Sequence, residues 1–139
     1  MNYTFSIIKP DSMSSGHQES ILQRIRNSKF SVMAISNRFL TTEEAKQFYS
    51  VHEGKPFFKD LIKFMTSGRI AVLALAYDGD AINSFRKLIG DTDPKESKVG
   101  TIRNLYGTDI GRNAIHGADS PENAKKEILF FFPELESKL

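Results

Sequence analysis

The chain has 139 residues, a formal net charge of +2 at pH 7 and no cysteine. Its length predicts one domain over residues 1–139, and 40% hydrophobic residues suffice for an ordinary core. The lack of cysteine excludes disulfides and thiolate metal sites. The small net charge disfavours a nucleic-acid binder that works by bulk electrostatics.

The sequence contains no apolar run near the roughly 18 residues that cross a bilayer. Its first residues lack the basic region and apolar segment of a secretory signal. We therefore expect a cytoplasmic protein, with neither a membrane nor nucleic acid as its partner.

The first half of the chain predicts two strands separated by a helix. Residues 3–8 alternate apolar and polar side chains, which predicts a strand that ends at Lys9-Pro10-Asp11. Apolar residues at helical spacing predict a helix over about 14–27. A second, less regular strand is expected over 32–40.

Helices then alternate with one strongly apolar strand. Residues 41–44 form a capping-box pattern that predicts a helix to about residue 49. The near-continuous apolar run at 70–77 predicts a buried central strand, and a helix is expected over 81–89. Between them a further helical stretch is predicted, with one apolar face made of Phe57, Leu61, Phe64 and Met65.

The apolar periodicity stops between residues 90 and 112, and a loop this long in a small domain is usually functional. A last amphipathic helix is expected to end near Pro133, with its apolar face made of Ala124, Ile128, Leu129 and Phe132. Strands that alternate with helices predict an α+β fold with helices on one face of the sheet. The ferredoxin-like βαββαβ arrangement, with an antiparallel sheet, fits this order best.

One histidine lies in a run of small residues, Asn113 to Ser120, that leads into the last helix. His116 is a candidate nucleophile because neutral imidazole leaves a ring nitrogen free, and Gly117 lets a ligand approach. Ser120 and the proline after it predict a helix start, where anions are favoured. A lone histidine of this kind is more often structural, and Glu127 is equally well a solvent-facing carboxylate.

Four cations stand at the ends of predicted elements: Lys9, Arg86, Arg103 and Arg112. Several positioned cations are what a transferring phosphoryl group requires, although most Lys and Arg are simply solvated surface charges. The proline that follows Lys9 holds it extended, which aims it off the end of a strand.

Other residues favour structural interpretations. Phe57 and Phe58 are more typical of a core pair than of a base-stacking platform, and Tyr49 is typical of the core. His17 and His52 are expected to be exposed, and neither belongs to a metal-ligand pattern. The sequence lacks a phosphate loop, zinc-binding spacing, a serine-nucleophile elbow and the aromatic motif of RNA-binding sheets.

Four motifs occur in one order over nearly the whole chain: IIKPDS at 7–12, PFF at 56–58, the GDTDP and SKVGTIR segments within 90–103, and GRNAIHGADS at 111–120. Together they resemble the nucleoside diphosphate kinase family. The resemblance implies transfer of the terminal phosphate of a nucleoside triphosphate to a nucleoside diphosphate in two half-reactions. The intermediate would be a phosphohistidine, with Mg²⁺ bound to the nucleotide and the chain assembled as a homotetramer or homohexamer.

The resemblance also implies a role for each matching residue. His116 would be the nucleophile, phosphorylated at Nδ1, and Glu127 would orient its imidazole. Lys9, Tyr49 and Asn113 would contact the transferred phosphate, and Lys9 and Asn113 would also meet the ribose. The remaining roles are nucleotide-phosphate binding by Arg86, Thr92 and Arg103, base contacts by Phe57 and Ile110, and a water-mediated metal contact by Asp119.

The chain departs from the family pattern at several positions, none of which removes a residue assigned to chemistry. Ser12 replaces the usual glycine after KPD, and Ala118 replaces a serine two positions after the histidine, which predicts reduced activity. Arg69, Asn104 and Leu105 differ where loops commonly meet neighbouring subunits. A short C-terminal tail favours a tetramer. The alternative to an active kinase is a nucleotide-binding or scaffold protein of the same fold that has lost catalysis.

Overall fold

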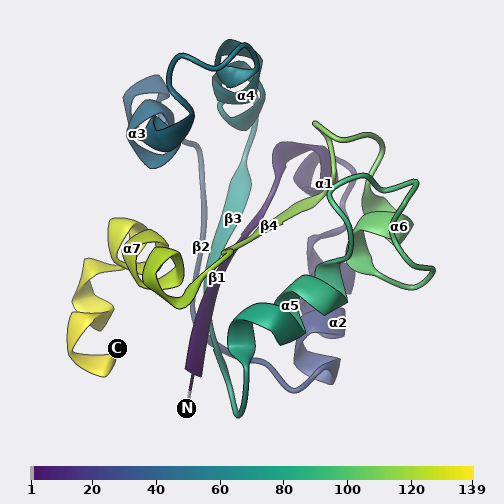
Figure 1. Cartoon of the computed structure of the whole chain (residues 1–139), viewed down its shortest axis with the longest axis vertical. Coiled ribbons are helices and arrows are strands. Elements are labelled where there is room, and N and C mark those ends of the chain that lie inside the picture. Colours follow the sequence, from purple (N-terminus) through teal and green to yellow (C-terminus); the bar gives the residue numbers. More distant parts are fainter. Residues whose placement is uncertain (1) are drawn as a thin grey trace.

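A computed structural model describes residues 2–139 and contains a four-stranded antiparallel sheet (Figure 1). The strands are β1 (Asn2–Ile8), β2 (Ser31–Arg38), β3 (Ile70–Tyr77) and β4 (Ile115–Gly117). Their order across the sheet is β2-β3-β1-β4, with β1 and β3 at its centre. This arrangement confirms the predicted ferredoxin-like α+β fold.

Seven α-helices and two short 3₁₀ segments accompany the strands in the described residues, and the last helix and the last 3₁₀ segment follow β4. The 3₁₀ segments are η1 (Ser50–His52) and η2 (Pro133–Lys138). The α-helices are α1 (Pro10–Ser14), α2 (Gln18–Asn27), α3 (Thr42–Phe48), α4 (Phe58–Met65), α5 (Ala81–Ile89), α6 (Ile102–Tyr106) and α7 (Pro121–Phe131). Within residues 2–139, none of these helices combines the length and the apolar character needed to span a membrane.

The central strand β3 is buried on both faces, which explains its continuous apolar sequence. Successive side chains of a strand point to opposite faces of the sheet. Accordingly Val72 and Ala74 belong to one buried cluster, whereas Leu73 and Leu75 belong to another, and all four are fully buried. Each face therefore presents apolar surface that must be covered.

Helices cover both faces, so the expectation of helices on one face was wrong. In Figure 1, α7 lies on the left of the sheet, and α5 and α2 lie on its right. The first cluster takes side chains from α3, α4 and α7, and the second takes them from α2, α5 and α6. The double-sided apolar pattern of β3 is the physical reason, because a single helical layer would leave one face in water.

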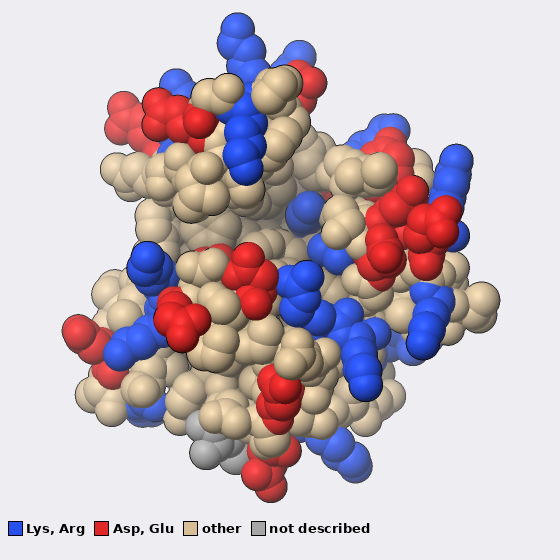
Figure 2. Space-filling view, in the orientation of Figure 1, with Lys and Arg blue, Asp and Glu red and all other residues tan. Residues whose placement is uncertain are grey.

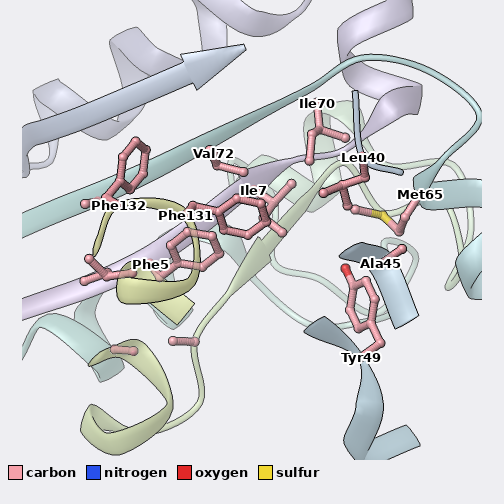
Figure 3. Close-up of a cluster of buried hydrophobic side chains, with 14 of the residues drawn as sticks. Phe5, Ile7, Leu40, Ala45, Tyr49, Met65, Ile70, Val72, Phe131 and Phe132 are labelled. Atoms are coloured by element: carbon pink, nitrogen blue, oxygen red, sulfur yellow. The ribbon is translucent and has the colours of Figure 1, made fainter. Parts of the chain in front are cut away.

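Aromatic packing fixes α7 against β1 in the first cluster (Figure 3). The rings of Phe5 and Phe131 stack with centroids 5.5 Å apart and planes 3° from parallel. Ser120 caps α7 by accepting a hydrogen bond from the Asn123 amide, and Pro121 fills its first turn, as predicted. The aromatic stack thus holds α7 against the sheet, and the cap fixes where the helix begins.

The prediction of which side chains of α4 are buried is only partly correct. Met65 is fully buried, and Ile62 joins it in the core. Phe57 is 48% exposed, and Leu61 and Phe64 are partly exposed, so the core-pair interpretation of Phe57 was wrong. These three apolar side chains line a cavity instead.

Two short helices were missed in segments predicted as a turn and a loop. Helix α1 begins at Pro10, where a turn was expected, and α6 interrupts the loop over 90–112. Each has five residues, and α6 buries only Ile102, so neither produces a helical periodicity in the sequence. The capping box predicted at Thr41 and Glu44 is present.

Candidate active site

His116 lies on the edge strand β4 and points toward α7. Strand β4 pairs with β1, and the hydroxyl of Ser6 donates to the His116 carbonyl at 2.8 Å. The imidazole Nε2 lies 2.7 Å from a carboxylate oxygen of Glu127 on α7. The rings of Phe5 and Phe48 meet the imidazole at centroid distances of 6.0 and 5.9 Å.

This hydrogen bond determines which imidazole nitrogen is available. An ionised carboxylate only accepts hydrogen bonds, so Nε2 carries the hydrogen when the ring is neutral. Nδ1 then keeps its lone pair. The side chains of His116 and Glu127 are 23% and 19% exposed, so the pair is shielded while the imidazole still reaches solvent.

The backbone that enters β4 is held in a conformation unusual for its residue. Ala114 has a φ of 76°, a left-handed value that costs energy for any residue with a Cβ. Its amide donates to Asp11 at 3.1 Å, and its carbonyl accepts from the Lys9 amide at 2.9 Å. These bonds join the end of β1 to the start of β4 and so set Lys9 and His116 side by side.

A chain of hydrogen bonds extends from Lys9 into the long loop. The Lys9 ammonium donates to the side-chain oxygen of Asn113 at 2.8 Å, and the Asn113 amide donates to the Thr92 carbonyl at 3.0 Å. Burial and, to a smaller extent, repulsion from Arg103 lower the pKa of Lys9 to about 8, while Asp11 partly opposes this. Lys9 is therefore close to losing its proton under mildly alkaline conditions.

Arg103 is held by neutral acceptors rather than by a carboxylate. Its guanidinium donates to the Gly90 carbonyl at 3.0 Å and to the Ile115 carbonyl at 2.9 Å. Burial lowers the pKa of Arg103 to about 10, with Arg86 adding to the effect. A charge that is partly removed from water without a counter-ion is unfavourable, so this cluster favours an incoming anion.

A cavity of about 950 Å³ opens beside these groups. Figure 2 shows a hollow between the region of α3 and α4 and the region of the long loop, with Lys and Arg atoms along its wall. Of the candidate site residues taken from the sequence, those that line this cavity are Lys9, Tyr49, Phe57, Thr92, Arg103, Ile110, Arg112, Asn113 and His116.

Two smaller cavities border the same groups. One of about 420 Å³ is lined by Arg86, Asp119 and Glu127, and His116 also borders it. Another of about 180 Å³ lies between Arg86 and Arg103. The structure thus brings together every residue that the sequence singled out for chemistry, from segments more than 100 positions apart.

The rim of the large cavity carries apolar and charged side chains. Phe57 and Ile110, from α4 and from the loop before β4, are 48% and 61% exposed. Arg112 is paired with Asp109 at 2.7 Å and is exposed, so it is a surface charge with a partner. Tyr49 is both a core residue and a cavity residue. Burial and the nearby Glu127 raise the pKa of Tyr49, which keeps its hydroxyl protonated as a donor.

Sequence reasoning missed two residues at this site. His52, expected to be exposed, is partly buried and borders both larger cavities, with its ring 5.3 Å from that of Phe57. Asp11 was assigned only to a turn, although it accepts the Ala114 amide. Neither residue belongs to a spacing pattern, so only the position of Asp11 directly after Lys9 and Pro10 gave a signal.

Comparisons with known proteins agree on one family. A family model described as nucleoside diphosphate kinase matches residues 2–137. The nucleoside diphosphate kinase of Syntrophotalea carbinolica is 46% identical over 136 residues, which is 98% of this chain and 98% of the relative. That of Persephonella marina is 43% identical over 134 residues, covering 96% and 94%.

Solved structures of the same family are also similar. The nucleoside diphosphate kinase of Aquifex aeolicus superposes with a TM-score of 0.93 at 42% identity, covering 97% of each chain. That of Halobacterium salinarum, solved in complex with CDP, gives a TM-score of 0.89 at 34% identity, covering 94% of this chain and 87% of the other.

The loop that positions Arg103 requires glycine at residue 90. Gly90 has a φ of 93°, and a Cβ there would lie 1.9 Å from the Ser97 hydroxyl oxygen. Gly100 has nearly the same φ, 92°, but open space around it. An alanine at residue 100 would therefore suffer only the backbone penalty, whereas an alanine at residue 90 would also suffer a steric clash.

We expect Gly100→Ala to cost about 1–2 kcal/mol of stability, the left-handed penalty alone. Gly90→Ala should cost at least ~2 kcal/mol more, because Ser97 and the loop must move. Urea denaturation of the two variants measures the difference. Equal losses in both variants would contradict the proposed packing of the loop around residue 90.

Proposed function

The chain belongs to the nucleoside diphosphate kinase family, and we propose that His116 carries the phosphate between its two nucleotide substrates. The protein is a phosphotransferase that moves the terminal phosphate of a nucleoside triphosphate to a nucleoside diphosphate. The observation that supports His116 most directly is its Nε2 bond to Glu127, which leaves Nδ1 as the free nucleophile.

Two displacements at phosphorus complete the reaction. In the first, the Nδ1 lone pair attacks the terminal phosphorus, the bond to the bridging oxygen breaks, and the nucleoside diphosphate leaves. In the second, a terminal oxygen of another diphosphate attacks the phosphohistidine and regenerates the imidazole. Glu127 stabilises the positive charge that the ring gains when Nδ1 is phosphorylated and Nε2 keeps its hydrogen.

Charge stabilisation should supply most of the rate, because the transferring group spreads charge over its oxygens. Lys9, Tyr49 and Asn113 are proposed to contact the transferred phosphate, with Lys9 and Asn113 also near the ribose hydroxyls. The lack of a carboxylate partner for Lys9 and for Arg103 in residues 2–139 supports phosphate binding by both cations. The proposed ligands of the other nucleotide phosphates are Arg86, Thr92 and Arg103.

The exposed side chains at the rim are proposed to hold the base. Phe57 stacks on one face of it, and Ile110 covers the other. Stacking tolerates every base because each has a π-face, so broad nucleotide specificity is expected. The exposure of both side chains supports this proposal, since neither is needed to fill the core.

The family requires a divalent cation, and we propose Mg²⁺. The described residues contain no group of three or more His, Asp or Glu that would hold a metal by itself. This donor set fits a cation carried mainly by the nucleotide phosphates, with Asp119 contacting it through water. When bound, such a cation neutralises charge on the phosphates.

Three further properties are proposals of the same kind. We propose that residues 1–139 form one catalytic domain, that copies assemble as a homotetramer or homohexamer, and that the protein acts in the cytoplasm, where its nucleotide substrates occur. A catalytically degenerate binding protein is not favoured, because the matching family model, relatives and solved structures are those of nucleoside diphosphate kinases.

Replacing the proposed nucleophile gives the first functional test. The protein is incubated with γ-labelled ATP and Mg²⁺, freed of nucleotide, and then given unlabelled GDP. We expect acid-labile label on the wild type that moves to GTP, and no label on His116→Ala, because the covalent intermediate cannot form. His17→Ala, at a histidine that lines none of the cavities of the site, serves as the matched control and should retain label. Label that persists in His116→Ala would contradict the proposal.

Glu127 is predicted to affect the chemical step rather than binding. Glu127→Gln keeps the size of the side chain but removes its charge, so kcat should fall roughly 10- to 100-fold while the Kd for ADP stays within about twofold. Glu122→Gln, at an exposed position on the same helix, is the control. A change confined to the Kd for ADP would argue against an orienting role.

The lowered pKa of Lys9 predicts the pH dependence of binding. Lys9 is protonated below about pH 8 and attracts phosphate there, and it loses this charge as the pH rises through its pKa. Affinity for ADP, measured by calorimetry, should therefore fall roughly tenfold between about pH 7.5 and about pH 9.5.

Two variants check the assignment of this pH effect to Lys9. Lys9→Arg keeps its charge throughout and should show no such fall, and Lys9→Gln should bind ADP weakly at both pH values. The assignment is wrong if Lys9→Gln loses affinity with pH as steeply as the wild type.

A further inference from the structure

Lys9 combines features that are unusual for a lysine at the wall of a cavity. The only hydrogen-bond partner of its ammonium group in residues 2–139 is the neutral side-chain oxygen of Asn113. No carboxylate lies within ion-pair distance of it among these residues. Asp11 is the one charged group on the same segment that acts on it. The other charged or titratable groups that line its cavity are Tyr49, His52, Asp60, Arg103, Asp109, Arg112 and His116, and of these Asp109 is paired with Arg112.

These surroundings favour the neutral amine. Burial disfavours the ammonium form, and the guanidinium of Arg103 repels it, whereas Asp11 opposes this only weakly as the smallest of the three effects. A lysine that is desolvated or placed beside another cation is the kind that acts as a nucleophile on carbonyl groups. The ammonium of an exposed lysine, by contrast, persists to about pH 10.

The same cavity recruits anions. Arg103 lies against the cavity wall, and neither of its guanidinium hydrogen bonds goes to an acidic group. With a volume of about 950 Å³, the cavity holds more than a phosphate group. A small molecule that carries both a phosphate and a carbonyl carbon would thus place its phosphate near Arg103 and its carbonyl near the Lys9 amine.

We propose that Lys9 is a covalent binding site for small phosphorylated aldehydes, which it captures as a reversible imine. The amine lone pair attacks the carbonyl carbon and forms a carbinolamine. This intermediate then loses water and leaves a C=N bond. The oxygen of the water comes from the carbonyl group, and both of its hydrogens come from the amine nitrogen of Lys9. No oxidant or reductant is needed, and hydrolysis restores the free amine.

The adduct would occupy the proposed phosphate site and remove the cation at residue 9, so nucleotide binding and imine formation exclude each other. The inference rests on the proposed function for the location of the phosphate site. It does not depend on phosphate transfer by His116, which takes no part in imine formation.

The test uses two phosphorylated aldehydes and one matched aldehyde without phosphate. Wild-type protein is treated at about pH 7.5 with pyridoxal 5′-phosphate, glyceraldehyde 3-phosphate or pyridoxal, reduced with borohydride and mapped by peptide mass spectrometry. At this pH roughly a quarter of the Lys9 amines are neutral, compared with about 0.1% for an ordinary exposed lysine. Lys46, exposed on α3, is the internal reference.

We expect both phosphorylated aldehydes to modify Lys9 at least about tenfold faster than Lys46. Excess ADP should suppress modification of Lys9 but not of Lys46, and pyridoxal should modify Lys9 about tenfold more slowly than its phosphate does. Lys9→Arg should lose the adduct at this position. His116→Ala should keep it while losing phosphate transfer.

Modification of Lys9 no faster than of Lys46, or insensitive to ADP or to the phosphate of the probe, would overturn the inference. Reaction with pyridoxal 5′-phosphate but not with glyceraldehyde 3-phosphate would also overturn it, because Lys9 would then not capture small phosphorylated aldehydes as a class. A wild type that transfers phosphate but forms no adduct refutes this inference alone. A wild type that forms the adduct but never a phosphohistidine refutes the proposed function alone.

Discussion

The hydrogen bond between His116 Nε2 and Glu127 is the interaction on which the proposed chemistry depends. It joins an edge strand of only three residues to the last α-helix, so both must be placed accurately. The strand is fixed by pairing with β1, and the helix by its cap at Ser120 and by aromatic packing on β1. Nδ1 is then the ring nitrogen that this bond leaves free, and it is the proposed nucleophile.

A second constraint is the placement of cations without counter-ions. Lys9 and Arg103 are held by carbonyl and amide oxygens, which orient them without neutralising them. The surrounding fold must compensate for the cost of keeping these charges partly buried, and the left-handed Ala114 adds local strain. Such costs are typical of sites that trade stability for binding an anion. Burial, together with repulsion from Arg103, lowers the pKa of Lys9 and explains why its ammonium group loses a proton easily.

Sequence patterns predicted the long elements but not the short ones. The period of two in β1, the apolar run of β3 and the caps of α3 and α7 all correspond to the structure. Five-residue helices give no periodic signal, and the covering of both sheet faces requires knowledge of how β3 alternates. Phe57 shows the limit most clearly, because an apolar residue beside a helix start is indistinguishable in sequence from a core residue.

The candidate residues came from motif resemblance, and the fold explains why distant motifs form one site. Lys9 and Asn113 meet because β1 and the segment before β4 are joined by backbone bonds at Ala114. The most direct test of the central claim is to locate the phosphate after reaction with ATP, by ³¹P NMR of the alkaline-stabilised protein and peptide mapping. The structure predicts one phosphate on Nδ1 of His116. Phosphate on Nε2, on another residue or on none would contradict the proposed role of the Glu127 bond.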